Sequence, residues 1–80
     1  MESKLANNQY IINTDNGIYF KSYNSIIVFK PRSGKIQLDI NDWDYSKTTG
    51  KYRNKFLNEK KIETERKIKS GEYELVDLNK

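Results

Sequence analysis

The chain contains no histidine and no cysteine among its 80 residues, and these two absences exclude much of protein chemistry. Histidine is the side chain whose ordinary pKa lies near neutral pH, so its absence excludes serine–histidine and cysteine–histidine catalytic pairs and histidine-ligated metals. Without cysteine there are no disulfides, no thiolate zinc site and no thiol nucleophile. A chain this short also buries too little surface to enclose a large active site. We therefore predict a binding protein and not an enzyme, with no cofactor and no metal.

Long hydrophobic runs are absent as well. The longest apolar run, Ile26–Phe29, is far too short to cross a bilayer. The first residues, Met1–Lys4, include an acid, and no apolar segment that would act as a secretion signal follows them. We expect a cytoplasmic protein with no membrane partner.

Positive charge is in excess, with 15 lysines and arginines against 11 aspartates and glutamates, a formal net charge of +4. The excess is concentrated in one segment, because residues 47–61 contain six basic residues and only one acid, Glu59. A clustered basic segment is typical of proteins that bind nucleic acid or another acidic partner.

The first half of the chain predicts an antiparallel meander of three to four strands. We expect residues 1–8 to be frayed, since they are polar. The residues that follow show the alternation or the apolar character of strands, and Asp15-Asn16-Gly17 is a strong hairpin signal. The segments predicted as strands are residues 9–13, 17–23, 25–30 and 35–40.

The second half predicts helix, because the apolar period lengthens from two toward 3.6 after Asp44. Tyr45, Thr49, Tyr52 and Phe56 fall on one helical stripe, and Ser46 or Asp44 is suited to cap the first turn. We expect the helix to dock on the sheet through Tyr52 and Phe56.

The sequence does not determine where this helix ends. Residues 58–69 are almost entirely charged, and they either continue the first helix or form a second one after a kink. Ser70-Gly71 ends the helical pattern, and residues 72–78 are expected to form a last strand or a docking tail. The whole chain, residues 1–80, is thus predicted as one α+β domain: a meander, one long or kinked helix, and a C-terminal strand or tail.

One group of residues favours an anion-binding site at the start of the helix. Lys47, Lys51 and Lys55 are spaced i, i+4, i+8 and form one basic ridge near the helix N-terminus, where free amides and the helix dipole attract anions. The predicted contact residues for a phosphate or an acidic partner are Ser46, Lys47, Thr48, Lys51, Arg53 and Lys55. The alternative is that these lysines form the ordinary solvated face of a helix.

A second group contains three carboxylates within six residues, Asp39, Asp42 and Asp44. A calcium loop counted from Asp42 needs a glycine at its sixth position and an acid at its twelfth, but these positions hold Lys47 and Arg53. We therefore interpret the cluster as a turn with a capping aspartate.

A third group is aromatic. Tyr19 and Tyr23 flank Lys21, and Trp43 and Tyr45 lie at the junction between strand and helix. Aromatic rings among basic residues suit single-stranded nucleic acid or the rim of a protein interface. The alternative is that the rings pack in the core, which is the role expected for Trp43.

The strings Ser22–Ile27 and Tyr45–Lys51 resemble those of a small domain of unknown function that recurs in proteins of bacteriophages and plasmids. The resemblance covers about residues 20–57 and rests on two strings, Ser22-Tyr23-Asn24-Ser25-Ile26-Ile27 and Tyr45-Ser46-Lys47-Thr48-Thr49-Gly50-Lys51. The second string matches the pattern Tyr-Ser-x-Thr-Thr-x-Lys. The resemblance implies an origin in a mobile element and an accessory task in the cytoplasm of a bacterial host, where small viral proteins of this size include anti-CRISPR inhibitors.

Two functional hypotheses follow. The first is a bacteriophage protein that binds and inhibits a host defence complex that handles nucleic acid, in the manner of an anti-CRISPR protein, so that its partner is a host protein or nucleoprotein complex. The alternative is a small basic protein that binds DNA or RNA directly through residues 46–55. The oligomeric state is left open, and an exposed strand edge is compatible with a homodimer.

Overall fold

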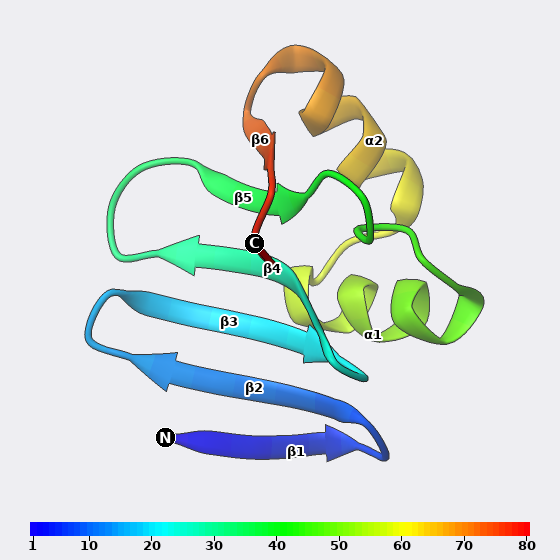
Figure 1. Ribbon diagram of the computed structural model, residues 1–80. Coiled ribbons are helices and arrows are strands. Elements are labelled where there is room, and N and C mark those ends of the chain that lie inside the picture. Colours follow the sequence, from blue (N-terminus) through cyan, green and yellow to red (C-terminus); the bar gives the residue numbers. More distant parts are fainter.

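The computed structural model describes all 80 residues as one six-stranded sheet with two helices (Figure 1). The elements are, in chain order, β1 (Glu2–Ala6), β2 (Gln9–Thr14), β3 (Gly17–Ser22), β4 (Ser25–Pro31), β5 (Ile36–Asp39), α1 (Lys47–Leu57), α2 (Lys61–Ser70) and β6 (Tyr73–Val76). The predicted α+β fold class is confirmed. Neither helix has the length and apolar character needed to span a membrane.

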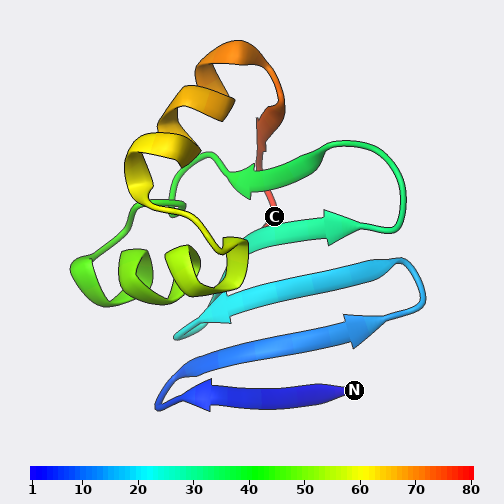
Figure 2. The same cartoon turned by 180° about the vertical axis from the view of Figure 1, so that it is seen from behind.

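The strands lie in the sheet in the order in which they occur in the sequence. Strands β1 to β5 form an antiparallel meander, whereas β6 pairs in parallel with β5. The parallel pairing arises because α1 and α2 form the crossover between these two strands, and both helices cover the same face of the sheet (Figures 1 and 2). The meander therefore has five strands, whereas three to four were expected.

The additional strand is β1, in the segment expected to be frayed. Met1 and Asn13 exchange two backbone hydrogen bonds of 2.6 Å, and β1 continues this pairing along β2. The sequence did not indicate this strand because β1 is an edge strand with mostly exposed residues, so it lacks the alternation of a half-buried strand.

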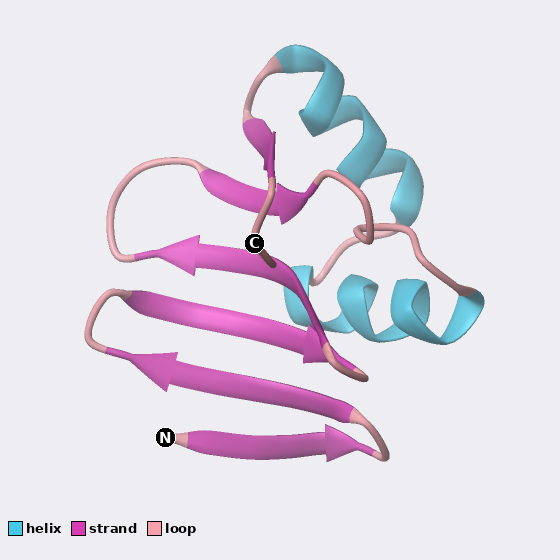
Figure 3. Ribbon diagram, in the orientation of Figure 1, coloured by secondary structure: helices cyan, strands magenta, loops and turns pink.

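The charged segment after α1 forms a second helix, because α1 ends at Asn58. Asn58 adopts the left-handed conformation, with φ of 56°, and its backbone N–H donates to the carbonyls of Asn54 and Lys55. Asparagine tolerates this conformation at a helix end, so α1 stops here and α2 leaves in a new direction. Gly71, with φ of 84°, ends α2 as predicted. Figure 3 shows α1 and α2 as two separate helices joined by a loop.

The hydrophobic core lies between the central strands and the helices. Its buried members come from β3, β4, β5 and β6: Phe20, Ile27, Val28, Leu38 and Tyr73. Helix α1 docks through Phe56, whose ring stacks on that of Phe20 at a centroid distance of 5.7 Å, and Tyr52 also packs against the core. Both residues predicted to dock this helix therefore do so.

The C-terminal segment is both a strand and a docking tail. Beyond β6, the side chain of Asn79 accepts from the backbone N–H of Ile26 at 2.7 Å and donates to its carbonyl at 2.9 Å. The buried carboxylate of Asp39 accepts from the backbone N–H groups of Asn41, Asp42 and Leu78. Asp39 thus caps the turn after β5 and holds the tail, in line with the structural interpretation of the acidic cluster.

Candidate anion-binding site

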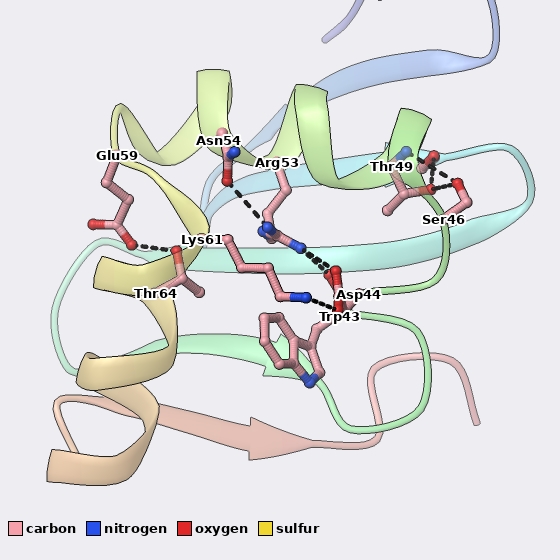
Figure 4. A network of polar contacts seen from close by, with 10 residues as sticks. Trp43, Asp44, Ser46, Thr49, Arg53, Asn54, Glu59, Lys61 and Thr64 are labelled. Carbon is pink, nitrogen blue, oxygen red and sulfur yellow. Dashed lines mark hydrogen bonds and ion pairs between the residues drawn. The ribbon is translucent and has the colours of Figure 1, made fainter.

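The N-terminus of α1 is anchored to the sheet by hydroxyl groups (Figure 4). Ser46 is the N-cap, and its Oγ accepts from the backbone N–H of Thr49 at 3.1 Å and donates to Thr49 Oγ1 at 3.2 Å. Thr49 Oγ1 in turn lies 2.8 Å from the Oγ of Ser22 in β3. This network fixes where the helix begins, so the side chains of its first turns have defined positions.

Arg53 lies on the inner side of α1 and is only 1% exposed. Its guanidinium donates to the carbonyl of Trp43 at 2.8 Å, to Asp44 Oδ1 at 3.2 Å and to Asn54 Oδ1 at 3.0 Å. The prediction of Arg53 as a surface contact needs correction, because Arg53 follows the buried Thr49 by one helical turn and therefore faces inward. Arg53 supplies fixed positive charge beneath the surface.

Asp44 joins Arg53 to the second helix. Its other oxygen, Oδ2, lies 2.6 Å from Lys61 Nζ at the start of α2 (Figure 4). Burial by itself raises the pKa of Asp44, but the hydrogen bonds and charges of Lys61 and Arg53 outweigh it and hold the pKa below its ordinary 3.8. The same hydrogen bond raises the pKa of Lys61. Both side chains are therefore charged at neutral pH.

An open depression of about 490 Å³ lies over this ion network. It has no hydrophobic lining, and Gly50 leaves its floor open, since a Cβ there would lie 3.6 Å from a guanidinium nitrogen of Arg53. Four cationic side chains and one carboxylate line it. The lining residues are Asp44, Ser46, Lys47, Gly50, Lys51, Arg53, Asn54 and Lys61.

The predicted basic ridge is present on the outer side of α1. Lys47, Lys51 and Lys55 are all exposed, and the Nζ atoms of Lys51 and Lys55 lie 5.4 Å and 5.2 Å from the ring centre of Tyr52. Thr48 is exposed in the first turn. The ridge and the depression share Lys47 and Lys51, so they form one continuous basic surface.

The predicted aromatic contacts separate into two groups. Tyr45 is 66% exposed and directly precedes the cap Ser46, whereas Trp43 is half-buried beneath Arg53. Tyr19 lies on the face of the sheet without helices, where it stacks on Phe29, and Tyr23 is exposed in the turn after β3. Trp43 is therefore joined to the site through Arg53, and Tyr45 is its neighbour in the sequence, but none of the four rings lines the depression.

Sequence reasoning missed the roles of Lys61 and Asp44 in this site. Lys61 belongs to α2, and no local spacing relates it to α1, so only the packing of the two helices brings it to Asp44. Asp44 was interpreted as part of a capping turn, and its charged neighbours follow it by nine and seventeen residues.

Residues 1–72 match the family of unknown function DUF8033. The chain belongs to this family. The predicted resemblance to a small domain of unknown function is thereby confirmed, and the match spans strands β1 to β5, both helices and the whole candidate site of this DUF8033 protein. No curated protein and no solved structure matches the chain. Because the family carries no assigned activity, the function of this DUF8033 protein is argued from its site.

Proposed function

We propose that this protein binds nucleic acid through its phosphates, uses α1 as the contact helix and catalyses no reaction. The observation that carries the proposal is the gathering of Lys47, Lys51, Arg53 and Lys61 around one depression with a single carboxylate. The depression lies at the N-terminal half of a helix whose first turn contains no acid. Both the side-chain charges and the helix dipole therefore favour an anion here.

The parts of the site have different roles in this proposal. Lys47 and Lys51 are exposed and contact phosphates directly, and Lys55 extends the contact along the ridge. Arg53 and Lys61 are held by Asp44, so they contribute positive charge in fixed positions. In this proposal the ring of Tyr45, which is exposed and directly precedes the Ser46 cap, stacks on a base beside the bound backbone.

The proposal is tested by fluorescence anisotropy with labelled duplex DNA, single-stranded DNA and RNA over a range of salt concentrations. We expect binding at low salt whose affinity falls steeply as salt rises, because phosphate contacts release counterions. Lys47→Glu with Lys51→Glu should abolish this binding, while two reversals outside the site, Lys35→Glu and Lys69→Glu, make the same change in net charge and should retain most of it. Absence of binding to all three probes at low salt overturns the proposal.

Inhibition of a host defence complex, with an origin in a bacteriophage or plasmid and a location in the bacterial cytoplasm, stays a prediction based on resemblance. It requires a stable complex with a purified host nucleoprotein. A complex of that kind that survives reversal of Lys47 and Lys51 would favour inhibition through another surface over direct binding of nucleic acid.

A further inference from the structure

Strand β1 is an edge of the sheet, with β2 on one side and no strand on the other (Figure 1). Met1 exchanges both of its backbone hydrogen bonds with Asn13, so the backbone groups of Met1 point toward β2. The pairing of β1 with β2 is regular from Glu2 to Lys4, and its register shifts only after Lys4, between Lys4 and Ala6. Over the regular part these directions alternate along the strand, which turns the N–H and C=O groups of Glu2 and Lys4 outward. An outward row of this kind is a template for a further strand.

We propose that two copies of the chain pair antiparallel through β1, about a two-fold axis at Ser3. In this register Glu2 lies opposite Lys4 of the partner subunit, and Lys4 lies opposite the partner's Glu2. These are the residues with outward backbone groups, so each pair exchanges two hydrogen bonds. The segment Met1–Leu5 reads apolar, acidic, serine, basic, apolar, which makes it complementary to itself when one copy is reversed.

Charge selects this register over its neighbours. The two other symmetric registers that pair outward backbone groups are centred on Glu2 or on Lys4. Each places two identical charges directly opposite one another, which destabilises a strand pair, whereas opposite charges stabilise it. Charged residues on an edge strand generally oppose its pairing with other strands. Here the charges of Glu2 and Lys4 oppose two registers and favour the one centred on Ser3.

An apolar groove beside β1 is completed in this dimer. Four apolar residues, Leu5, Ile11, Ile18 and Phe56, line a hollow of about 250 Å³ together with Lys30 and Lys55, on the face of the sheet that carries the helices. Met1 is 94% exposed, and in the proposed register it lies opposite the partner's Leu5. Because opposite residues share one face of a sheet, the side chain of each Met1 covers the groove of the other copy.

The dimer has a consequence for binding, which rests on the proposed function. A two-fold axis perpendicular to the sheet leaves both α1 helices on the same face, so two basic ridges face the same side. A polyanion that spans both sites gains avidity without any new contact.

The experiment measures the mass of the protein alone by sedimentation equilibrium, without nucleic acid, so that the result is independent of the proposed function. An edge pairing of this size belongs to the small, weak interfaces, so we expect the mean mass to rise above 9.5 kDa between about 10 µM and 1 mM. Glu2→Lys alone, or Lys4→Glu alone, places like charges opposite each other and should weaken dimerisation about tenfold or more. Lys35→Glu, in the turn before β5, is the matched control and should leave the dimer intact.

Two rescues make the test specific for the register. In the double variant Glu2→Lys/Lys4→Glu, a lysine at position 2 again lies opposite a glutamate at position 4 of the partner subunit. In an equimolar mixture of the two single variants, a dimer of one copy of each variant also places opposite charges across both pairs. Both should recover a dimer, and circular dichroism should show every variant folded. A monomer at all concentrations overturns the proposal, and so does a dimer that neither single reversal weakens.

Discussion

The guanidinium of Arg53 lies 5.2 Å from the ring centre of Trp43 and also donates a hydrogen bond of 2.8 Å to the backbone carbonyl of Trp43. Two interactions with one residue therefore join α1 to the loop that leaves β5. The buried arginine both anchors the helix and places positive charge beneath the basic surface.

Replacing Arg53 should be costly for stability. We expect Arg53→Met to lower the free energy of unfolding by about 2–3 kcal/mol, because the part-buried carbonyl of Trp43 and the amide oxygen of Asn54 lose their donors. Urea denaturation measures the change. Lys51→Met, on the exposed side of the same helix, should change the same quantity by less than about 0.5 kcal/mol. Equal effects of the two substitutions would contradict the structural role of Arg53.

Gly50→Ala should separate stability from binding. Alanine favours a helix interior over glycine by about 1 kcal/mol, and the new Cβ would meet its nearest neighbour at an ordinary 3.6 Å. We therefore expect a higher unfolding midpoint in urea. The same methyl group lies over the guanidinium of Arg53, so affinity for nucleic acid should fall severalfold. A stabilised variant with unchanged affinity would place the phosphates on the ridge and away from the depression.

Stability should decrease in acid because of Glu59. Its carboxylate accepts from Thr64, Lys67 and Tyr73, which links the loop after α1 to α2 and β6. Burial by itself raises the pKa of Glu59, but these hydrogen bonds and the charge of Lys67 outweigh it and lower the pKa below its ordinary 4.5. A carboxylate whose pKa is lower in the folded protein stabilises the fold at pH values above its pKa in the unfolded chain. This stabilisation is lost as the pH falls through its pKa in the folded protein.

We therefore expect the free energy of unfolding to fall as the pH drops below about 4.5, the ordinary value for this group. Glu59→Gln should lower stability at pH 7 by about 1–3 kcal/mol and flatten the pH dependence. Glu72→Gln, an exposed control, should do neither. An unchanged pH profile in Glu59→Gln would assign the acid sensitivity to Asp44, whose pKa is also lowered.

The tail contact predicts a local effect. Asn79→Ala removes both hydrogen bonds to the backbone of Ile26, so the amide of Ile26 should exchange its hydrogen faster. Because the contact is exposed, the free energy of unfolding should fall by only about 1 kcal/mol. Hydrogen exchange followed by NMR measures the protection, and an unchanged rate at Ile26 would contradict the contact.

The pairing of charges on α2 shows where local patterns mislead. Lys67 is spaced to pair with Glu63 one turn earlier in the helix, but its Nζ bonds Glu59 in the loop before α2 at 2.7 Å. Glu63 pairs with Arg66 instead. The buried oxygen of Glu59, supported by Thr64 and Tyr73, is a stronger partner than an exposed carboxylate on the same helix.

Local chemistry was sufficient for the central strands, the Ser46 cap, the end at Gly71 and the exposed ridge of Lys47, Lys51 and Lys55. Each depends on residues within one turn or one strand of each other. Packing decided the rest, because the partners lie far apart in the chain. Arg53 faces inward toward Trp43, Lys61 reaches Asp44 from the second helix, and β1 forms only because Gln9–Thr14 offers it an edge. The lack of histidine and cysteine excluded, from the start, only the chemistry that depends on those two side chains, and the tertiary structure determined that Lys47, Lys51, Arg53 and Lys61 share one site and that β1 is an edge of the sheet.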